Sequence, residues 1–191
     1  MIERAASPRL ECDLPDGLLA VRAAEGDEDS FAVLVRRHSR SLLTLARCML
    51  GNPQDAEDAV QDAFVSAWRR LPEYRHSAEF RTWMYRITVN RCLAMRRRRL
   101  PPLSLNTVLE PVAGDAWSQP DRSAERDAAA TALTRALAEL DAGQRICWIL
   151  REVQGMPYRE IAHVTRTSEP TVRGRLFRAR RSLQEAMDPW R

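Results

Sequence analysis

Apolar residues recur at steps of three and four along the first half of this chain, a spacing typical of the buried side of a long helix. The clearest stripe consists of Phe31, Leu34, Val35, His38, Leu42, Leu45, Ala46 and Met49. Gly51 follows it, and glycine commonly ends a helix. No segment of the 191 residues shows a convincing strand pattern, which would alternate apolar and polar residues. The sequence therefore predicts an all-α fold.

A second helix is predicted directly after Gly51, because Asn52 and Pro53 provide a cap and a first-turn proline. The segment 53–64 carries four acidic residues and no basic residue. The buried stripe of this helix is Val60, Ala63, Phe64, Ala67, Trp68 and Leu71. Its opposite side carries Asp55, Asp58 and Asp62. We expect these carboxylates to face solvent or a partner.

A third helix is predicted after a loop, because Pro72 ends the second and Ser77 can cap one that begins near Phe80. The segment 80–99 contains seven arginines and no acidic residue. Aromatic residues accompany these arginines in the loop and the helix; they are Tyr74, Phe80, Trp83 and Tyr85. Rings stack on exposed bases while guanidinium groups hold the phosphates, so this segment is a candidate site for single-stranded DNA.

Simpler interpretations of the third helix stay open. Phe80 and Trp83 could belong to the core, and the arginine run 96–99 could be a solvated helix end. Tyr74, Tyr85 and the arginines are harder to bury. Asn90, one turn from Arg86, could offer both a donor and an acceptor to a base edge.

Helical order is lost between residues 100 and 121 and then returns. The interrupted stretch contains four prolines and one glycine without helical periodicity, and so predicts a flexible linker between two domains. Helices are expected across 124–140 and 144–154, the second closed by Gly155. The sequence MPYREIAHV and a helix capped by Ser168 that runs to about Met187 then predict a helix-turn-helix, whose second helix fits the major groove. That last helix is basic, although it could be only a solvated amphipathic helix; its arginines are Arg173, Arg175, Arg178, Arg180 and Arg181.

Composition argues against an enzyme, a membrane protein and a disulfide-linked domain. All 30 residues counted as Lys+Arg are arginines, against 26 acidic residues, which gives a net charge of +4. The three histidines include His38 on the apolar stripe and His163, for which packing is the simpler interpretation, and no catalytic residue, metal ligand, cofactor or small-molecule substrate is predicted. The four cysteines lie dozens of residues apart, and the start of the chain has no secretory or transit signal. A cytoplasmic chain is expected.

Two stretches together resemble the extracytoplasmic-function (ECF) family of bacterial sigma factors. The family's region 2 is similar to NPQDAEDAVQDAFVSAWRRL followed by FRTWMYRITVNRCLAMRRRR. Its region 4 is similar to LAELDAGQRICWILREVQGMPYREIAHVTRTSEPTVRGRLFRARRSLQE. The resemblance implies an N-terminal extension with a first short helix (1–24), a region 2 domain of three or four helices (25–99), a linker (100–121) and a helix-turn-helix region 4 (122–191).

The resemblance implies an alternative sigma factor that binds core RNA polymerase, directs it to promoters and helps to melt the DNA. Its partners would be the beta-prime clamp helices, the beta flap and promoter DNA. The polymerase contacts would be Asp55, Asp58, Gln61, Asp62 and Val65. The minus-ten element would be held by Tyr74, Arg75, Arg81, Arg86 and Asn90. The minus-thirty-five element would be read by Thr171, Arg173, Gly174, Phe177 and Arg178.

Members of this family are commonly held inactive by an anti-sigma factor, often one anchored in the membrane, so a similar partner and retention at the inner membrane are expected here. The turn before the last helix departs from the family, because Arg166 and Thr167 stand where glycine and isoleucine are usual. Three other functions stay open. They are a helix-turn-helix activator that binds duplex DNA, an adaptor that mimics region 2 to sequester an anti-sigma factor, and an arginine-rich RNA-binding protein.

Overall fold

The structure is a computed structural model that describes residues 14–74, 78–99 and 124–188, without the side chains of 99 and 124–130. Every regular element in these ranges is helical, as predicted. The first four α-helices and a short 3-10 turn are α2 (Asp16–Ala24), α3 (Glu28–Leu50), α4 (Pro53–Arg70), η1 (Leu71–Glu73) and α5 (Phe80–Arg99). The others are α6 (Ala124–Glu139), α7 (Ala142–Trp148), η2 (Ile149–Val153), α8 (Tyr158–Thr165) and α9 (Glu169–Met187). The predicted linker, residues 100–121, lies outside the described ranges.

Local sequence fixes the helix ends much as expected. The Asp27 carboxylate caps α3 by accepting the backbone N–H groups of Asp29 and Ser30. Gly51 ends α3 in the left-handed conformation at φ 73°, which glycine adopts without a steric cost. Asn52 then caps α4 by accepting the N–H of Asp55 at 3.1 Å. The chain can therefore reverse direction between α3 and α4 within very few residues.

Helices α2 to α5 form an N-terminal unit in which α3 packs along both α4 and α5. Its centre is apolar, with Leu34, Leu45, Ala63 and Met84 all fully buried. The predicted stripe of α3 is confirmed, except that Phe31 and Val35 lie at its half-buried edge. Helix α5 is buried around more of its circumference than a single apolar stripe would allow.

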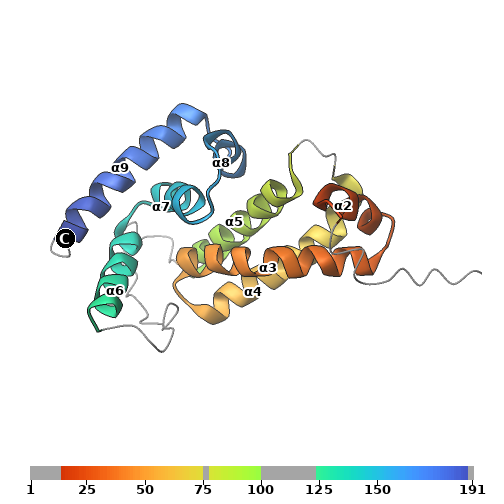
Figure 1. The fold of residues 1–191 in the computed structure, drawn as a ribbon, viewed down its shortest axis with the longest axis horizontal. Helices are drawn as coiled ribbons and strands as arrows, with labels where there is room; N and C mark the ends of the chain where they lie inside the picture. The colour runs from red at the N-terminus through yellow and green to blue at the C-terminus, as the bar shows by residue number, and fades with distance from the viewer. Residues whose placement is uncertain (1–13, 75–77, 100–123, 189–191) are drawn as a thin grey trace, which may run out of the picture.

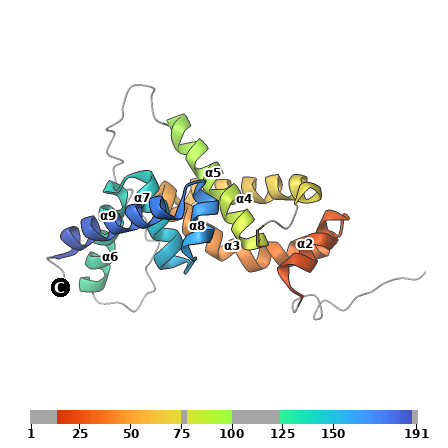
Figure 2. The ribbon, with the colours of Figure 1, turned by 90° about the horizontal axis from the view of Figure 1, so that it is seen from above.

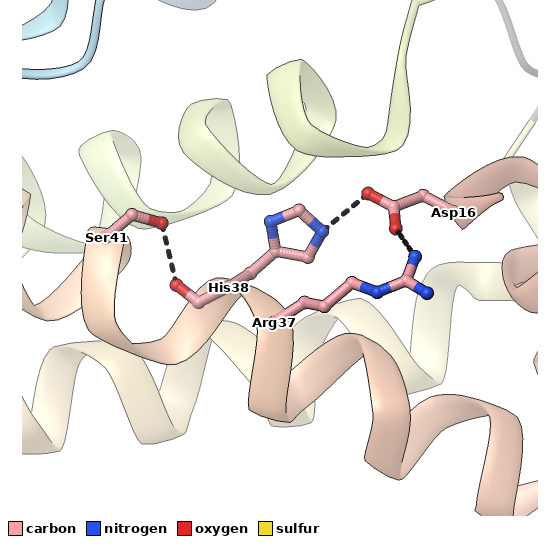
Figure 3. Close-up of polar contacts among 4 residues, drawn as sticks. All are labelled: Asp16, Arg37, His38 and Ser41. Carbon is pink, nitrogen blue, oxygen red and sulfur yellow. Dashed lines mark hydrogen bonds and ion pairs between the residues drawn. The ribbon is translucent and has the colours of Figure 1, made fainter. Parts of the chain in front are cut away.

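An ion-pair cluster anchors α2 to α3 (Figure 3). The Asp16 carboxylate lies 2.7 Å from Nε2 of His38 and 2.5 Å from Nη1 of Arg37. The His38 ring is 8% exposed, and its centroid lies 5.5 Å from that of Phe80. His38 is therefore a satisfied boundary residue, as its place on the apolar stripe predicted.

Helices α6 to α9 form a C-terminal unit. The predicted helix 144–154 starts earlier, at Ala142, because the Asp141 carboxylate caps α7, and it ends as the wide π-turn η2. Arg145 is 4% exposed and donates to the backbone carbonyls of Ala138 and Leu140, which would otherwise be unsatisfied at the end of α6. Burial, together with the like charge of Arg96, lowers the pKa of this guanidinium to about 10, although the Asp141 carboxylate acts in the opposite direction.

The two units meet where α8 lies against α5 and where α7 and η2 approach α3 (Figures 1 and 2). Buried apolar residues form one continuous cluster across this boundary, from Leu34 and Met84 in the N-terminal unit to Ile149 and Ile161 in the C-terminal unit. The second side of α5 is buried for this reason, because α8 packs along it and Gln154, directly after η2, forms hydrogen bonds with its side chains. Sequence periodicity predicted the two units but not their contact.

Candidate nucleic-acid and protein interfaces

The acidic side of α4 is accessible over most of its length. Asp58, Gln61 and Val65 are exposed, with Val65 at 45%, while the side chain of Asp62 is 46% exposed. Asp55 is different, because only 8% of it is exposed. The expectation that Asp55 faces solvent is therefore wrong.

The reason for the burial of Asp55 lies in its position on α4. It belongs to the same row of the helix as Ala59 and Ala63, four and eight residues further on, and both alanines are fully buried. It also lies in the first turn, beside the reversal of the chain at Asn52. A row of buried alanines behind an acidic residue is a sequence pattern that could have indicated its burial.

A hollow of about 330 Å³ lies between the acidic side of α4 and the basic side of α5. It is lined by Asp58, Gln61, Asp62, Arg91, Met95 and Arg98. Arg91 forms an ion pair with Asp62 across it. No described residue forms an ion pair with Asp58. The structure thus groups three of the five predicted polymerase contacts around one hollow, and Asp58 is its acidic group without an ion pair to another described residue.

Aromatic rings gather at the start of α5, beside Tyr74 at the end of η1. The Tyr74 ring lies 4.9 Å from Trp83 and 6.0 Å from Phe80, and the Tyr74 hydroxyl donates to the carbonyl of Ala78 at 2.6 Å. Partial burial raises the pKa of this hydroxyl, so it stays a donor. Phe80 and Trp83 are 2% and 7% exposed, and are core residues. Tyr74 is half-buried, and Arg75 lies outside the described residues.

The predicted minus-ten residues on α5 do not form one open surface. Asn90 is exposed, but the guanidinium of Arg81 donates to the carbonyl of Gln154 and Nη1 of Arg86 lies 3.3 Å from Nε2 of His163. Both partners belong to the C-terminal unit. Burial lowers the pKa of Arg86, and the like charges of Arg166 and Arg70 lower it further.

Tyr85 corrects a second expectation. The sequence analysis expected the Tyr85 side chain to be hard to bury because of its hydroxyl group. In the structure Tyr85 is 0% exposed, and its hydroxyl donates a hydrogen bond to Oε1 of Gln154 at 2.6 Å. The hydrogen bond satisfies the phenol in the interior, so its burial carries no unpaired polar group. Sequence analysis did not identify Gln154, because its role depends on the contact between the two units.

Helix α9 presents its predicted reading side to solvent. Val172, Leu176, Ala179 and Leu183 face the core, and Phe177 on the other side is 69% exposed. Thr171, Arg173 and Arg178 are also exposed, while Gly174 is half-buried. The hydroxyl of Ser168 accepts the N–H of Thr171 at 3.3 Å, which confirms the predicted cap.

Arginine side chains on α9 have distinct local partners. Arg173 lies 3.6 Å from the Glu169 carboxylate and 6.0 Å from the centroid of the Tyr158 ring. Arg180 is held by Glu152 at 2.7 Å. Arg178 has no ion-pair partner among the described residues. These pairs leave Phe177 and Arg178 as the least constrained members of the predicted reading side.

Arg166 connects the two helices of the helix-turn-helix in the left-handed conformation, at φ 52° and ψ 46°. An L residue with a side chain pays about 1–2 kcal/mol in this region, whereas glycine does not. The departure from the family's usual glycine thus places an arginine where the backbone favours glycine. Thr167 nevertheless closes the turn, because its N–H donates to the carbonyl of Ala162 at 3.0 Å.

The described cysteines are buried or half-buried, and burial raises the pKa of Cys48, Cys92 and Cys147, in Cys92 to about 12. Protonated thiols are poor nucleophiles and poor metal ligands. No group of three potential metal ligands occurs among the described residues. In the same part of the chain, no helix combines the length and apolarity that a membrane crossing needs.

Comparison with known proteins assigns both units. The Sigma-70 region 2 model matches residues 34–100, and the Sigma-70 region 4 model matches residues 130–183. The chain is 38% identical to the ECF RNA polymerase sigma factor SigM of Mycobacterium tuberculosis over 87% of this chain and 81% of the relative. It is 32% identical to the ECF RNA polymerase sigma-E factor of Escherichia coli over 92% of this chain and 96% of the relative.

Solved structures agree with this assignment. The structure of CnrH in complex with the cytosolic domain of CnrY is similar with a TM-score of 0.70 and 31% identity, over 91% of this chain and 97% of that chain. The sigma factor RpoE of Bartonella quintana, solved with the anti-sigma factor NepR, has a TM-score of 0.65 at 22% identity over 83% of this chain and 96% of that chain, and supports the fold alone.

An acidic helix, a helix rich in arginine and a helix-turn-helix, joined in one all-helical chain, define a specificity subunit of transcription rather than an enzyme. With both region models matched and relatives above 30% identity along nearly their full length, the chain belongs to the ECF family of RNA polymerase sigma factors within the sigma-70 family.

Proposed function

We propose that this sigma factor binds core RNA polymerase through the acidic side of α4, with Asp58, Gln61, Asp62 and Val65 against the clamp helices of the beta-prime subunit. The observation that carries the proposal is the hollow beside α4, which brings the accessible carboxylate of Asp58 and the amide of Gln61 together with the apolar side chain of Met95. Opposite charges at such a surface guide association and select the partner. Asp55 is not included among these contacts, because its side chain is buried. The C-terminal unit would contact the beta flap.

Promoter opening is assigned to α5 and the loop before it. Tyr74, Arg81, Arg86 and Asn90 would hold the displaced strand of the minus-ten element, together with Arg75. Extruding a base costs a few kcal/mol, and each aromatic stacking contact returns about 1–3 kcal/mol. The packing of Tyr74 against Trp83 supports this role, because it holds the half-buried ring in a fixed orientation.

Duplex recognition at the minus-thirty-five element is assigned to α9. Thr171, Arg173, Gly174, Phe177 and Arg178 would face the major groove, as the second helix of a helix-turn-helix does. The exposure of Phe177 at 69% supports this role, because its ring is accessible to a base in the groove. An exposed ring can contact the methyl group of thymine, and arginine pairs with guanine.

An anti-sigma factor is the proposed regulator. The structure of CnrH contains the cytosolic domain of CnrY, and CnrH is similar to this chain over almost its whole length. We infer a partner of the same kind, anchored in the inner membrane, that covers polymerase-binding surface.

Run-off transcription with purified core polymerase and genomic DNA tests this function. We expect start sites that require the purified chain and share two upstream sequence elements. A chain that binds duplex DNA but gives no start site would be an activator instead, and a chain without either activity would fit an adaptor.

A further inference from the structure

The hollow beside α4 has a second wall, formed by α5, and the contacts proposed above all lie on the first. Arg91, Met95 and Arg98 line the hollow from the second wall. Their spacing of four and then three residues places them on one face of α5, and Arg98 lies about 10 Å further along the helix than Arg91. The hollow is therefore built by two helices and is not a feature of α4 alone.

The charges of the hollow are only partly compensated within the chain. Two carboxylates and two guanidinium groups line it, so that its net charge is zero. Arg91 is neutralised by its ion pair with Asp62, which joins the two walls. Arg98 is exposed and, like Asp58 on the opposite wall, forms no ion pair with a described residue. The hollow thus offers one carboxylate and one guanidinium group to a partner.

This pair of opposite charges favours a protein helix over a nucleic acid as the partner. The phosphates of DNA would bring several negative charges close to the Asp58 carboxylate, which repels them. A helix with a basic and an acidic side chain three or four residues apart presents both on one face, and so can pair with Asp58 and Arg98 together. Met95 lies on the same face of α5 as Arg98, and its flexible thioether adapts to the apolar surface of such a helix.

We propose that the polymerase-binding surface continues from α4 onto α5: one polymerase helix places a cation on Asp58, a carboxylate on Arg98 and an apolar side chain against Met95. The proposal rests on the proposed function, since it takes the partner to be core polymerase. Arg98 is then a determinant of partner choice. A helix with only basic residues on this face would satisfy Asp58 but would be repelled by Arg98.

The proposal separates two neighbouring members of the arginine run 96–99. Arg97 is exposed like Arg98, but it does not line the hollow. Successive residues of a helix point about 100° apart, so the two guanidinium groups leave α5 in different directions. Arg98 faces the hollow and a partner docked on α4, whereas Arg97 does not. The two residues therefore provide a matched comparison.

The test compares Arg98→Glu with Arg97→Glu in the full chain. Both variants make the same charge change at adjacent exposed positions of one helix, so they change the net charge of the protein equally. Arg98→Lys is a third variant that keeps the positive charge. Each variant competes with fluorescently labelled wild-type chain for purified core polymerase in the absence of DNA, and circular dichroism checks that its helicity is unchanged.

We expect Arg98→Glu to bind core polymerase at least about tenfold more weakly than wild type, because it places like charges together at the interface. Arg97→Glu should weaken binding by less than about threefold, since an exposed charge outside the interface acts weakly through solvent. Arg98→Lys should bind more tightly than Arg98→Glu, because the ammonium group can still pair with a carboxylate.

Three results would overturn the proposal. The first is equal binding of the two glutamate variants, and the second is an Arg98→Lys variant that binds as weakly as Arg98→Glu. The third is an Arg98→Glu variant that binds core polymerase like wild type and weakens only promoter binding by the assembled holoenzyme, because Arg98 would then contact DNA. Failure of the proposed function looks different, since Asp58→Arg would then compete for core polymerase as well as the wild-type chain does.

Discussion

The carboxylate of Asp16, in the first turn of α2, lies 2.7 Å from Nε2 of His38 in the middle of α3, and the His38 ring in turn contacts Phe80 at the start of α5 (Figure 3). The hydrogen bond and the ring contact together connect three helices of the N-terminal unit. Asp16 precedes the residues matched by the region 2 model.

We predict that Asp16→Ala lowers the free energy of unfolding by about 1–2 kcal/mol, because it leaves the largely buried His38 without its charged acceptor. Urea denaturation followed by circular dichroism measures the change. Arg37→Ala should cost less than about 1 kcal/mol, because the Arg37 side chain is 30% exposed and solvent weakens its ion pair. Equal losses in the two variants would contradict the special role of His38.

Asp58→Arg should reduce co-elution with core polymerase at least about tenfold, because like charge at an interface costs more than 1.4 kcal/mol. Helicity should be unchanged, since Asp58 is exposed. Glu57→Arg is the control, as this neighbouring carboxylate lies 3.4 Å from Arg47 on α3 and outside the hollow. Co-elution of the Asp58 variant at the wild-type level would refute docking through α4.

Arg86→Ala with Asn90→Ala should impair promoter opening more than duplex binding. Both side chains are proposed to hold the separated strand, which exists only after melting. Permanganate footprinting reports the opening, and gel shift with closed duplex reports the binding. Arg36→Ala on α3 makes the same charge change at an exposed position outside the site. An equal loss of both activities would exclude strand capture.

Arg173→Ala should change which base is preferred in the upstream element, because a bidentate arginine contact is worth about 1–3 kcal/mol against the wrong base. Binding selection from a randomised upstream element measures the preference. Arg181→Ala, on the same helix and paired with Glu185, should weaken all sequences alike or have no effect. A uniform loss for the Arg173 variant would make it a phosphate contact.

Arg166→Gly should stabilise the C-terminal unit by about 0.5–1 kcal/mol, because glycine relieves the left-handed backbone but loses more entropy on folding. The same change at Arg159, exposed in the first turn of α8 with an ordinary helical backbone, should instead destabilise, because glycine loses more backbone entropy on folding. Urea denaturation of both full-length variants provides the comparison. Destabilisation in both would mean that the Arg166 side chain makes a contact that outweighs the strain.

Most helix ends were predictable because the chemistry that sets them is local. Asn52, Pro53, Gly51 and Ser168 act within a few residues of themselves, and their roles follow from the order of residues alone. The π-turn η2 was not predictable, since its sequence continues an ordinary helical pattern. Asp55 was misjudged because it was grouped with Asp58 and Asp62 rather than with Ala59 and Ala63, which share its row of the helix and are buried.

The candidate surfaces also fall into two groups, those that the sequence predicted and those that it did not. Charge segregation and helical spacing identified the acidic side of α4 and the exposed side of α9, because both depend on one helix and its own core. The burial of Tyr85 and the partners of Arg81 and Arg86 depend on residues about 70 positions away or more. Contacts between residues so far apart in the chain leave no periodic pattern in the sequence.

By itself, the order of amino acids determined which segments are helical, where most of them begin and end, and which side of each is charged. Only the tertiary structure decided that α8 and Gln154 cover α5, because that contact depends on side chains from two distant units meeting in one geometry. Local hydrogen bonds set the first kind of feature, and the burial of shared apolar surface sets the second.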